Sequence, residues 1–427
     1  MPENTPDLKP GRPSRVRFGV LGVLFLLAIV TYIDRVCISL AAPWITAELH
    51  LTPVEMGAVF STFAVTYALF AVPTAWLGDR FGARRVLAGI VFLWSAFTAV
   101  TGMVYRFAAL LVVQFLFGAT QAGAYPNITR AVANWFPADR RGSAMGTVWM
   151  GSRLGAALTP PLALLLMRRY GWRVTFYLLG ALALIWVCGW LAWYRDDPAK
   201  KKSVNALELE LIRAGRFESS GKPLAPGSWK SAFTHKNLWA LYLMYFNLGF
   251  VYYLYISWFP TYLLRDRGVE VAQLGFYASL PLAFSCLANL LGGITTDKLV
   301  RRWGLVWGRR GVGIAGCAAS AAFLLAGLQV KAMPAAILLI SLAPAACDFT
   351  LASSWATCAD IGGPLAGTIS GAMNMVGNVG SVLSPILMGF LVQTTGKWGL
   401  TFYIAALLNV AGALLWFTIN PARKLEN

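Results

Sequence analysis

Charged residues are scarce in this chain. Asp, Glu, Lys and Arg make up 13% of its 427 residues, about half of their share in an average soluble domain. Only two histidines occur, His50 and His235, and no nucleotide loop, metal-ligand cluster or nucleophile arrangement accompanies them. The six cysteines have neither metal-site nor disulfide spacing. These absences argue against a soluble fold, an enzyme, and a protein that depends on a metal or another cofactor.

What the chain has in abundance is apolar sequence. Hydrophobic residues make up 58% of it, and the mean hydropathy is +0.61. Apolar runs of about 20 residues recur along its whole length, and each is long enough to cross a bilayer as a helix. Helix is the expected form because lipid offers the backbone no hydrogen-bond partners. We therefore predict an all-α membrane protein with twelve transmembrane helices. The predicted spans are 18–42, 53–77, 86–104, 108–133, 142–167, 172–194, 237–263, 272–296, 309–328, 333–357, 366–392 and 399–419.

The distribution of Lys and Arg predicts the orientation. With both termini in the cytoplasm, the cytoplasmic segments carry 25 of these residues and the outer loops carry 8, as the positive-inside rule requires. This asymmetry also accounts for the net charge of +18 without a nucleic-acid partner. The N-terminus is too polar, and the first apolar run too long, for a cleaved signal peptide. We expect a multi-pass protein of the inner membrane, surrounded by the lipid bilayer.

The second part of the chain repeats the first. Two sets of identities recur, one at an offset of 225 residues and one at 226. They are Gly142, Gly146, Met150, Gly155 and Pro160 with Gly367, Gly371, Met375, Gly380 and Pro385, and Trp172, Thr175, Phe176 and Tyr177 with Trp398, Thr401, Phe402 and Tyr403. The offset spans six helices, an even number, so the two six-helix bundles share one orientation. A pseudo-two-fold axis normal to the membrane would relate them.

One long polar segment divides the two bundles. The predicted organisation is a tail at 1–17, a bundle at 18–194, a cytoplasmic linker at 195–236, a bundle at 237–419 and a tail at 420–427. Within the linker, residues 203–216 are expected to form an amphipathic helix at the membrane interface, with Glu208 among its polar positions.

The loops after the second helix of each half share a pattern of charge. One reads Gly78-Asp79-Arg80-Phe81-Gly82-Ala83-Arg84-Arg85, and the other contains Gly293, Asp297-Lys298 and Arg301-Arg302. Positive-inside charge alone would explain the bases but not the acid. These paired loops resemble the signature of the major facilitator superfamily, whose 6+6 plan the whole chain follows.

Further segments resemble one branch of that superfamily, the anion:cation symporter family. It includes sialin, vesicular glutamate transporters and bacterial carriers for hexuronate, galactonate and glucarate. The segments are Tyr32-Ile33-Asp34-Arg35, Trp135-Phe136-Pro137, Trp258-Phe259-Pro260-Thr261-Tyr262-Leu263 and the stretch from Trp355 to Asn374.

Four ionisable side chains lie well inside predicted helices: Asp34, Arg35, Arg153 and Asp348. Each costs roughly 2.5–3.5 kcal/mol at mid-membrane on insertion scales, so we expect them to face a polar cavity or one another. Two are acids and two are bases, which suits a carrier that admits an anion together with a proton. An anion docked on Arg35 or Arg153 would deprive a carboxylate of its partner, and that carboxylate would bind a proton more readily. Ion pairs that only pin the helices together are the alternative.

The resemblance implies roles for particular residues. Arg35 matches the family's contact for a substrate carboxylate, and a guanidinium offers a carboxylate a bidentate fork. Asp34 matches a protonation site, and Tyr67 matches a substrate-contacting tyrosine. Further substrate-side positions are Ser354, Trp355 and Asn374. An aromatic side chain at such a position could equally serve core packing.

Helix four departs from the family's pattern. Where members have an Arg followed seven residues later by a Glu, this chain has Gln114 and Gln121. We hypothesise that Arg153 and Asp348 replace the lost pair, Arg153 at the substrate and Asp348 in proton coupling, while Gln121 keeps a substrate-side position. Arg130, near the end of the same helix, is expected to snorkel to the membrane interface.

A gate is the last feature that the resemblance implies. Asp79, Arg80 and Arg84 match the superfamily's cytoplasmic gate, and Asp297 is the equivalent acid in the second half. An acid at the end of helix two can pair with the start of helix eleven, where the helix dipole favours negative charge.

The sequence therefore predicts a monomeric secondary transporter that works by alternating access. Its expected solute is a small organic anion carried with a proton, by preference a sugar acid such as a hexuronate or an aldonate. One alternative is a sodium-coupled or exchange carrier for an aromatic or dicarboxylic acid. Another is a membrane sensor that binds a solute without moving it.

Overall fold

The computed structural model of the protein describes residues 12–51, 53–213 and 228–424, and within these ranges it contains helices and no strand. The long helices are α1 (Val16–Leu49), α2 (Pro53–Phe81), α3 (Ala83–Thr101), α4 (Phe107–Gln121), α5 (Ala124–Trp135), α6 (Arg141–Trp193), α8 (Lys236–Arg265), α9 (Val271–Gln329), α10 (Met333–Gly362), α11 (Ala366–Thr395) and α12 (Gly399–Thr418). Shorter elements are α7 (Ala206–Arg213) and the 3₁₀ turns η1 (Ala138–Arg140), η2 (Pro198–Lys200), η3 (Ser228–Phe233) and η4 (Gly363–Leu365).

These elements account for the twelve predicted spans. α4 and α5 together occupy the predicted fourth span, while α6 and α9 each hold two spans that reverse at one residue. Gly171 in α6 (φ 81°) and Gly304 in α9 (φ 78°) adopt the left-handed region that favours glycine. By length and composition, nine segments of the described chain could cross a membrane, and one of them, Phe276–Gln329, contains the reversal at Gly304.

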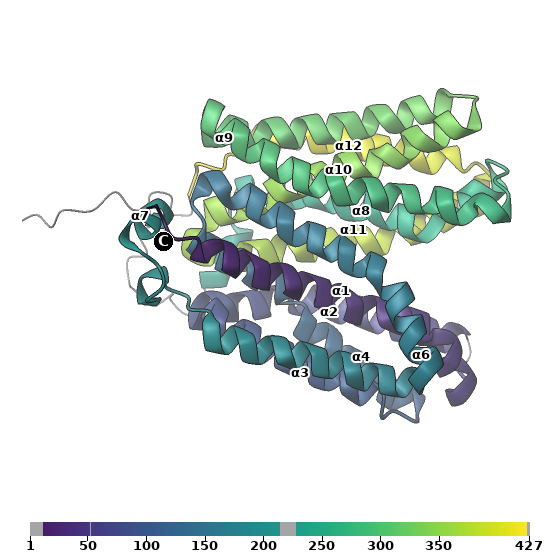
Figure 1. Ribbon diagram of the computed structural model, residues 1–427. Coiled ribbons are helices and arrows are strands. Elements are labelled where there is room, and N and C mark those ends of the chain that lie inside the picture. The colour runs from purple at the N-terminus through teal and green to yellow at the C-terminus, as the bar shows by residue number, and fades with distance from the viewer. Residues whose placement is uncertain (1–11, 52, 214–227, 425–427) are drawn as a thin grey trace, which may run out of the picture.

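The helices form two bundles side by side. Figure 1 shows α1 to α6 in one bundle, here the N-half, and α8 to α12 in the other, here the C-half. Across the boundary, α2 packs on α11 and α6 packs on α9. These two contacts are equivalent under the internal repeat, because each joins the second helix of one half to the fifth helix of the other. The predicted all-α fold of two related six-helix bundles is confirmed. The exact domain limits stay a prediction.

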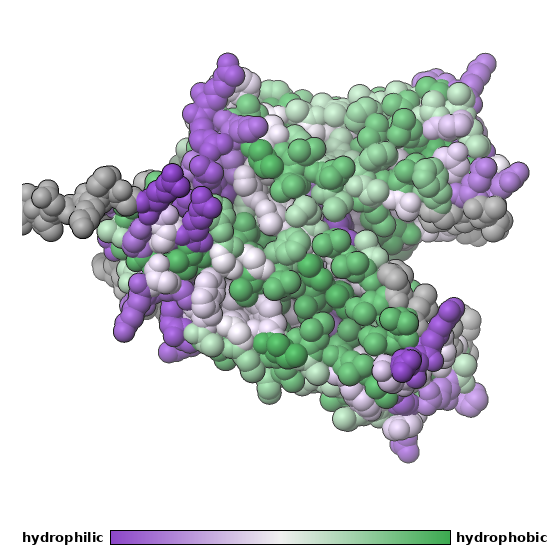
Figure 2. Space-filling view, in the orientation of Figure 1, coloured by the Kyte–Doolittle hydropathy of each residue, from purple (hydrophilic) through white to green (hydrophobic). Residues whose placement is uncertain are grey.

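The two ends of the molecule differ. Figure 1 places the start of α1, α7 and the C-terminus at one end, which we call the terminal face. Figure 2 shows a hollow between the two halves at the opposite end and contact between them at the terminal face. In this view hydrophilic residues gather at both ends, and apolar residues cover most of the visible surface between them, as expected of a bilayer-spanning protein.

The linker helix differs from its prediction. Helix α7 begins at Ala206 rather than at residue 203, and residues 214–216 lie outside the described ranges. Glu208 is fully buried rather than solvent-facing. Its carboxylate accepts bonds from the amides of Val16 (3.1 Å) and Arg17 (3.2 Å) and from the Ser14 hydroxyl (2.6 Å). It therefore holds the N-terminus of α1, where unpaired amides need acceptors, a long-range contact that helical periodicity does not reveal.

Candidate functional site

At the terminal face, two buried acids join the halves by binding helix N-termini. Asp79, at the end of α2, accepts bonds from the amides of Gly367 (3.1 Å) and Thr368 (2.6 Å) and from the Thr368 hydroxyl (2.7 Å) at the start of α11. Asp297 of α9 accepts bonds from the amides of Gly142 (3.0 Å) and Ser143 (2.5 Å) at the start of α6. The helix dipole and the unpaired first amides favour an anion at both places. The expected contact between Asp79 and helix eleven is present.

Three further charges extend the Asp297 contact into a network. Arg309 lies 3.1 Å from Asp297 and 3.0 Å from Asp360, and Arg141 lies 2.7 Å from the other oxygen of Asp360. All four side chains are buried and their charges sum to zero. Because Arg141 belongs to the N-half and the others to the C-half, the network ties the halves together. The sequence prediction missed Arg141, Arg309 and Asp360. The available signal was Asp360, the lone acid between helices ten and eleven.

The arginines near this gate differ in whether they contact the other half. Arg130 does not snorkel to the interface, so that expectation is wrong. Its guanidinium donates to the carbonyls of Gly363 (3.0 Å) and Pro364 (2.6 Å) in the C-half, and it lies 3.8 Å from Asp79. Arg80 lies over the rings of Trp76 and Phe81, which are neighbours on its own helix.

Arg84 contacts α6 and the segment that directly follows it. Its guanidinium donates to the Leu191 carbonyl at 2.5 Å, and its amide donates to the Asp196 carboxylate at 3.0 Å. Burial raises the pKa of the Asp196 carboxyl above its ordinary value. For Arg80 and Arg84, a gating role therefore remains a prediction from resemblance alone.

Deeper between the halves, Arg35 occupies an aromatic cage. Its guanidinium carbon lies 5.2 Å from the ring centre of Tyr32, 5.3 Å from that of Phe63 and 4.6 Å from that of Tyr67. Its Nε donates to Gln121 at 3.1 Å, while the buried Nη2 has no hydrogen-bond partner among the described residues. No carboxylate of the described chain forms an ion pair with it. Arg35 is thus a held cation whose charge is uncompensated, a fit for an incoming anion.

Arg153 and Asp348 form an ion pair across the halves. Arg153 Nη2 of α6 lies 2.8 Å from Asp348 Oδ2 of α10, and Asn289 of α9 donates to the same oxygen at 3.4 Å. The Arg153 guanidinium also lies 4.2 Å from the ring centre of Tyr252 on α8. The structure therefore brings together the two residues expected to replace the charges missing from helix four.

Asp34 lies apart from Arg35 despite their adjacency in sequence. The side chain is buried, and neither carboxylate oxygen has a hydrogen-bond partner among the described residues. The Trp94 indole of α3 lies next to it, and the buried indole nitrogen likewise lacks a hydrogen bond of good geometry. Asp34 therefore faces the interior of the N-half.

Of the three remaining predicted positions, one contacts the cage around Arg35, and the other two form hydrogen bonds within the C-half. Asn374 of α11 donates to the hydroxyl of Tyr67 at 3.2 Å, which links the C-half to the cage around Arg35. Trp355 donates to the hydroxyl of Tyr245 at 2.9 Å and is fully buried. Ser354 donates to the carbonyl of Thr350 in its own helix at 3.0 Å, so its hydroxyl is already engaged.

An aromatic cluster spans the boundary near Trp355. Tyr125 stacks on Trp149 with ring centres 4.4 Å apart, and Trp355 lies 5.3 Å from Trp149. Tyr32 meets the edge of Tyr125 at 6.4 Å, which connects the cluster to the cage of Arg35. Tyr125 and Trp149 were absent from the predicted site, because aromatic residues in apolar helices give no distinguishing signal.

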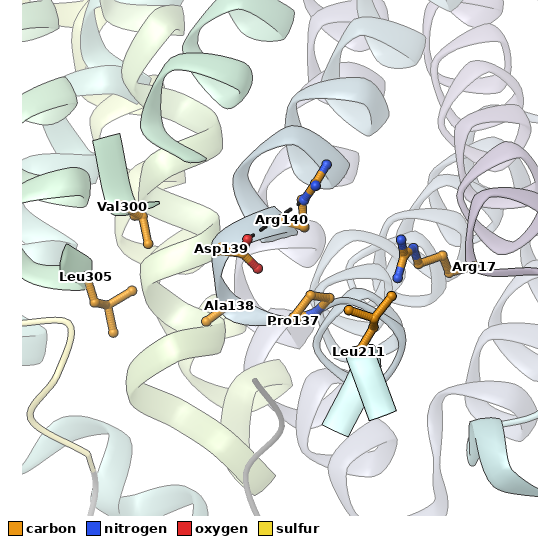
Figure 3. Close-up of a pocket in the computed structure, with 8 residues that line it drawn as sticks. All are labelled: Arg17, Pro137, Ala138, Asp139, Arg140, Leu211, Val300 and Leu305. Atoms are coloured by element: carbon orange, nitrogen blue, oxygen red, sulfur yellow. Dashed lines mark ion pairs between the residues drawn. The ribbon is translucent and has the colours of Figure 1, made fainter. Parts of the chain in front are cut away.

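A second hollow lies at the terminal face. Figure 3 shows its lining residues, which are Pro137 to Arg140, Arg17, Leu211 of α7, and Val300 and Leu305 of α9. Its volume is about 470 Å³. Its ion pair, Asp139 with Arg140 at 3.8 Å, is solvent-exposed. In contrast to the interior charges, none of its lining residues carries an unpartnered buried polar atom. The central charges are therefore the stronger candidate site.

Comparisons with known proteins agree with this architecture. A family model described as Major Facilitator Superfamily matches residues 24–385. A probable sulfoacetate transporter, SauU, of Cupriavidus necator is 35% identical over 416 residues, which cover 97% of this chain and 96% of that protein. A probable L-galactonate transporter of Escherichia coli is 30% identical over 420 residues, which cover 97% and 92% respectively.

A solved structure gives a likeness of fold alone. The human organic anion transporter MFSD10 (TETRAN) has a TM-score of 0.68 at 18% identity, and the match covers 94% of this chain and 100% of that one.

Proposed function

Because the chain belongs to the major facilitator superfamily, and is thus a transporter rather than an enzyme, we propose that it carries a small organic anion together with a proton. The halves rock about the central site to expose it to each side in turn. The preferred solute class is the sugar acids, to which hexuronates and aldonates belong.

The observation that carries this proposal is the state of Arg35. The described structure pairs no carboxylate with it, and its Nη2 has no hydrogen-bond partner. An uncompensated cation is costly inside a membrane protein. A solute carboxylate would compensate it with charge-assisted bonds, so the site favours an anion over a neutral sugar. The relatives named for sulfoacetate and L-galactonate support the same class, since both named solutes are organic acids.

Two carboxyl groups are the proposed proton carriers. An ionised Asp34 would be a buried charge without a partner, which costs several kcal/mol. Its surroundings therefore suit a group that holds a proton during part of the cycle. Asp348 is paired with Arg153 and would need a proton only when that pair opens. This difference makes Asp34 the proposed primary coupling site.

The arrangement of the two faces supports an assignment of the conformation. With both termini in the cytoplasm of a cell whose inner membrane holds the protein, the hollow of Figure 2 would face outward. The Asp79 and Asp297 contacts would then be the closed inner gate. A solute would enter from outside, reach Arg35, and leave inward after those contacts break. The protein is expected to do this as a monomer.

Uptake into proteoliposomes tests the proposal. The purified full chain is given a panel of sugar acids and other organic acids, with and without an inward proton gradient. We expect the gradient to drive accumulation of at least one acid. Asp34→Asn should abolish accumulation while it spares exchange of internal for external solute. The matched control is Asp139→Asn, which alters an exposed acid on the terminal face.

The opposite outcomes have distinct meanings. Uptake that is equal with and without the gradient would refute proton coupling and favour sodium coupling, exchange or facilitated diffusion. If no acid is taken up, the anion assignment fails, and a solute sensor becomes the better reading.

A further inference from the structure

Arg153 binds its acid partner incompletely. Only Nη2 bonds to Asp348, at 2.8 Å, while Nε and Nη1 are buried without a hydrogen-bond partner in the described structure. An arginine fork binds a carboxylate best through two parallel N–H bonds. The pair therefore neutralises the charge of Arg153 but leaves most of its hydrogen-bonding capacity unused.

The pair keeps a small exposed surface that the terminal network lacks. The Arg153 and Asp348 side chains keep 6% and 9% of their surface exposed, and they approach each other from opposite halves. By contrast, Arg141 and Asp360 at the terminal face are 1% exposed each. An acidic group in the central site would compete with Asp348 for Arg153, whereas the terminal network offers it no access.

The two central arginines belong to one site. Tyr32 lies 5.2 Å from the Arg35 guanidinium, and its ring centre lies 6.4 Å from that of Tyr125. The Tyr125 hydroxyl is hydrogen-bonded at 2.7 Å to Ser152, the residue before Arg153 in α6. One cation has no acid partner and the other has a replaceable one, so the site can accept two negative groups.

We propose that Arg153 is the second anion-binding group of this site and that the transported solute carries two acidic groups, such as two carboxylates or a carboxylate and a sulfonate. This inference rests on the proposed function, and among the sugar acids it favours diacids such as glucarate over the monoacid hexuronates and aldonates. One acidic group binds Arg35. The other replaces Asp348 on Arg153: the Arg153–Asp348 contact breaks, an Arg153–solute contact forms, and Asp348 takes up a proton from solvent.

Matched solutes that differ in one group test the inference. D-glucarate and D-gluconate differ only at one chain end, where a carboxylate replaces a hydroxymethyl group. Sulfoacetate and glycolate differ in the same sense, with a sulfonate in place of a hydroxyl. Inhibition of counterflow in proteoliposomes of the full chain gives an apparent affinity for each. In at least one pair, the diacid is expected to bind at least tenfold more tightly, about the effect of one charge-assisted contact.

Two variants distinguish a role of Arg153 in solute binding from a purely structural role. Arg153→Gln should reduce the affinity for the diacid by on the order of 10- to 100-fold and leave the matched monoacid within about twofold, so that the preference disappears. Asp348→Asn should tighten the diacid, because it removes the competing carboxylate from Arg153. A purely structural role would make Arg153→Gln affect both solutes equally.

Three results would overturn the inference while the proposed function stands. They are equal affinities within both pairs, an equal loss for both solutes in Arg153→Gln, and tighter binding of an aromatic monoacid such as 4-hydroxybenzoate than of either diacid. The last would point to the apolar pocket of about 220 Å³ beside Tyr252. If Arg153→Gln does not fold, the wild-type ratios and Asp348→Asn decide. Uptake of no acid at all would instead refute the proposed function.

Discussion

Two layers of buried charge lie at or near the boundary between the halves, and they differ in how completely their bonds are made. In the terminal layer, which comprises Asp79, Arg141, Asp297, Arg309 and Asp360, no charged side chain has a buried atom without a hydrogen bond. The neighbouring Arg130, which is partly exposed, leaves only its Nε without one. In the central layer, which comprises Asp34, Arg35, Arg153 and Asp348, unpartnered atoms remain on Asp34, Arg35 and Arg153.

This difference separates a structural contact from a binding site. A fully bonded charge network gains nothing from a ligand and loses much when it is broken. A partly bonded network is destabilised by its buried polar groups that lack partners. A ligand of opposite charge removes that penalty when it bonds to them. The same residue types, Asp and Arg, therefore serve opposite purposes at two depths of one interface. The comparison predicts that substitutions in the terminal layer change which face is open, whereas those in the central layer change what binds.

The largest effect is expected from Asp360→Asn. It leaves Arg141 and Arg309, both buried, without the carboxylate that they share. Removal of one partner from a buried ion pair costs about 3–5 kcal/mol. Much of this loss would destabilise the conformation in which the terminal face is closed. Cys358 is a native reporter, because it is fully buried two residues away. Its reaction with a maleimide should be at least about 100-fold faster.

The background for this measurement replaces Cys188 and Cys286, which are not buried, by serine. Cys317 is fully buried inside the C-half, so its labelling would signal unfolding rather than opening. Asp139→Asn is the matched control, because its ion pair with Arg140 is exposed. Unchanged labelling of Cys358 in Asp360→Asn would show that the network does not keep the face closed.

An intermediate effect, of a different kind, is expected from Arg35→Gln. No described carboxylate loses its partner, so the thermal unfolding midpoint in detergent should stay close to that of the wild type. Affinity for the transported acid should fall by roughly 10- to 100-fold, the worth of a hydrogen bond to a charged group. Arg309→Gln is the contrasting variant, because it removes the cation that Asp297 and Asp360 share and should lower the unfolding midpoint. If both variants lower it equally, the distinction between the layers is wrong.

The sequence predicts one of these layers much better than the other. Asp34, Arg35, Arg153 and Asp348 stand out because charge inside an apolar run is rare, and the cost of burial requires an explanation for each. The pairing of Arg153 with Asp348 follows from the same reasoning. The isolation of Asp34 from Arg35 does not, because neighbours in a helix point about 100° apart, and the packing of α3 decides what each one meets.

The terminal layer was only half predictable. Its two acids appear in the repeated loops, and the partner of Asp79 could be placed by the helix dipole. Arg141 and Arg309 were hidden among the many basic residues that the positive-inside rule already explains. Arg130 and Glu208 were assigned to solvent or interface for similar reasons. Both instead bind backbone groups of distant segments, and such contacts depend on three-dimensional packing that no local pattern encodes.

The smallest effect is expected from Thr368→Val, which sharpens the comparison within the terminal layer. The substitution keeps the shape of the side chain and removes the hydroxyl that donates to Asp79 at 2.7 Å. Asp79 retains the amides of Gly367 and Thr368, so the loss should be about 1 kcal/mol, or roughly fivefold faster labelling of Cys358. Thr368→Ser keeps the hydroxyl and should label at the wild-type rate. An effect of Thr368→Val as large as that of Asp360→Asn would mean that the Asp79 contact, rather than the four-residue network, keeps the terminal face closed. Equal rates in Thr368→Val and Thr368→Ser would mean that the two amides alone suffice at Asp79.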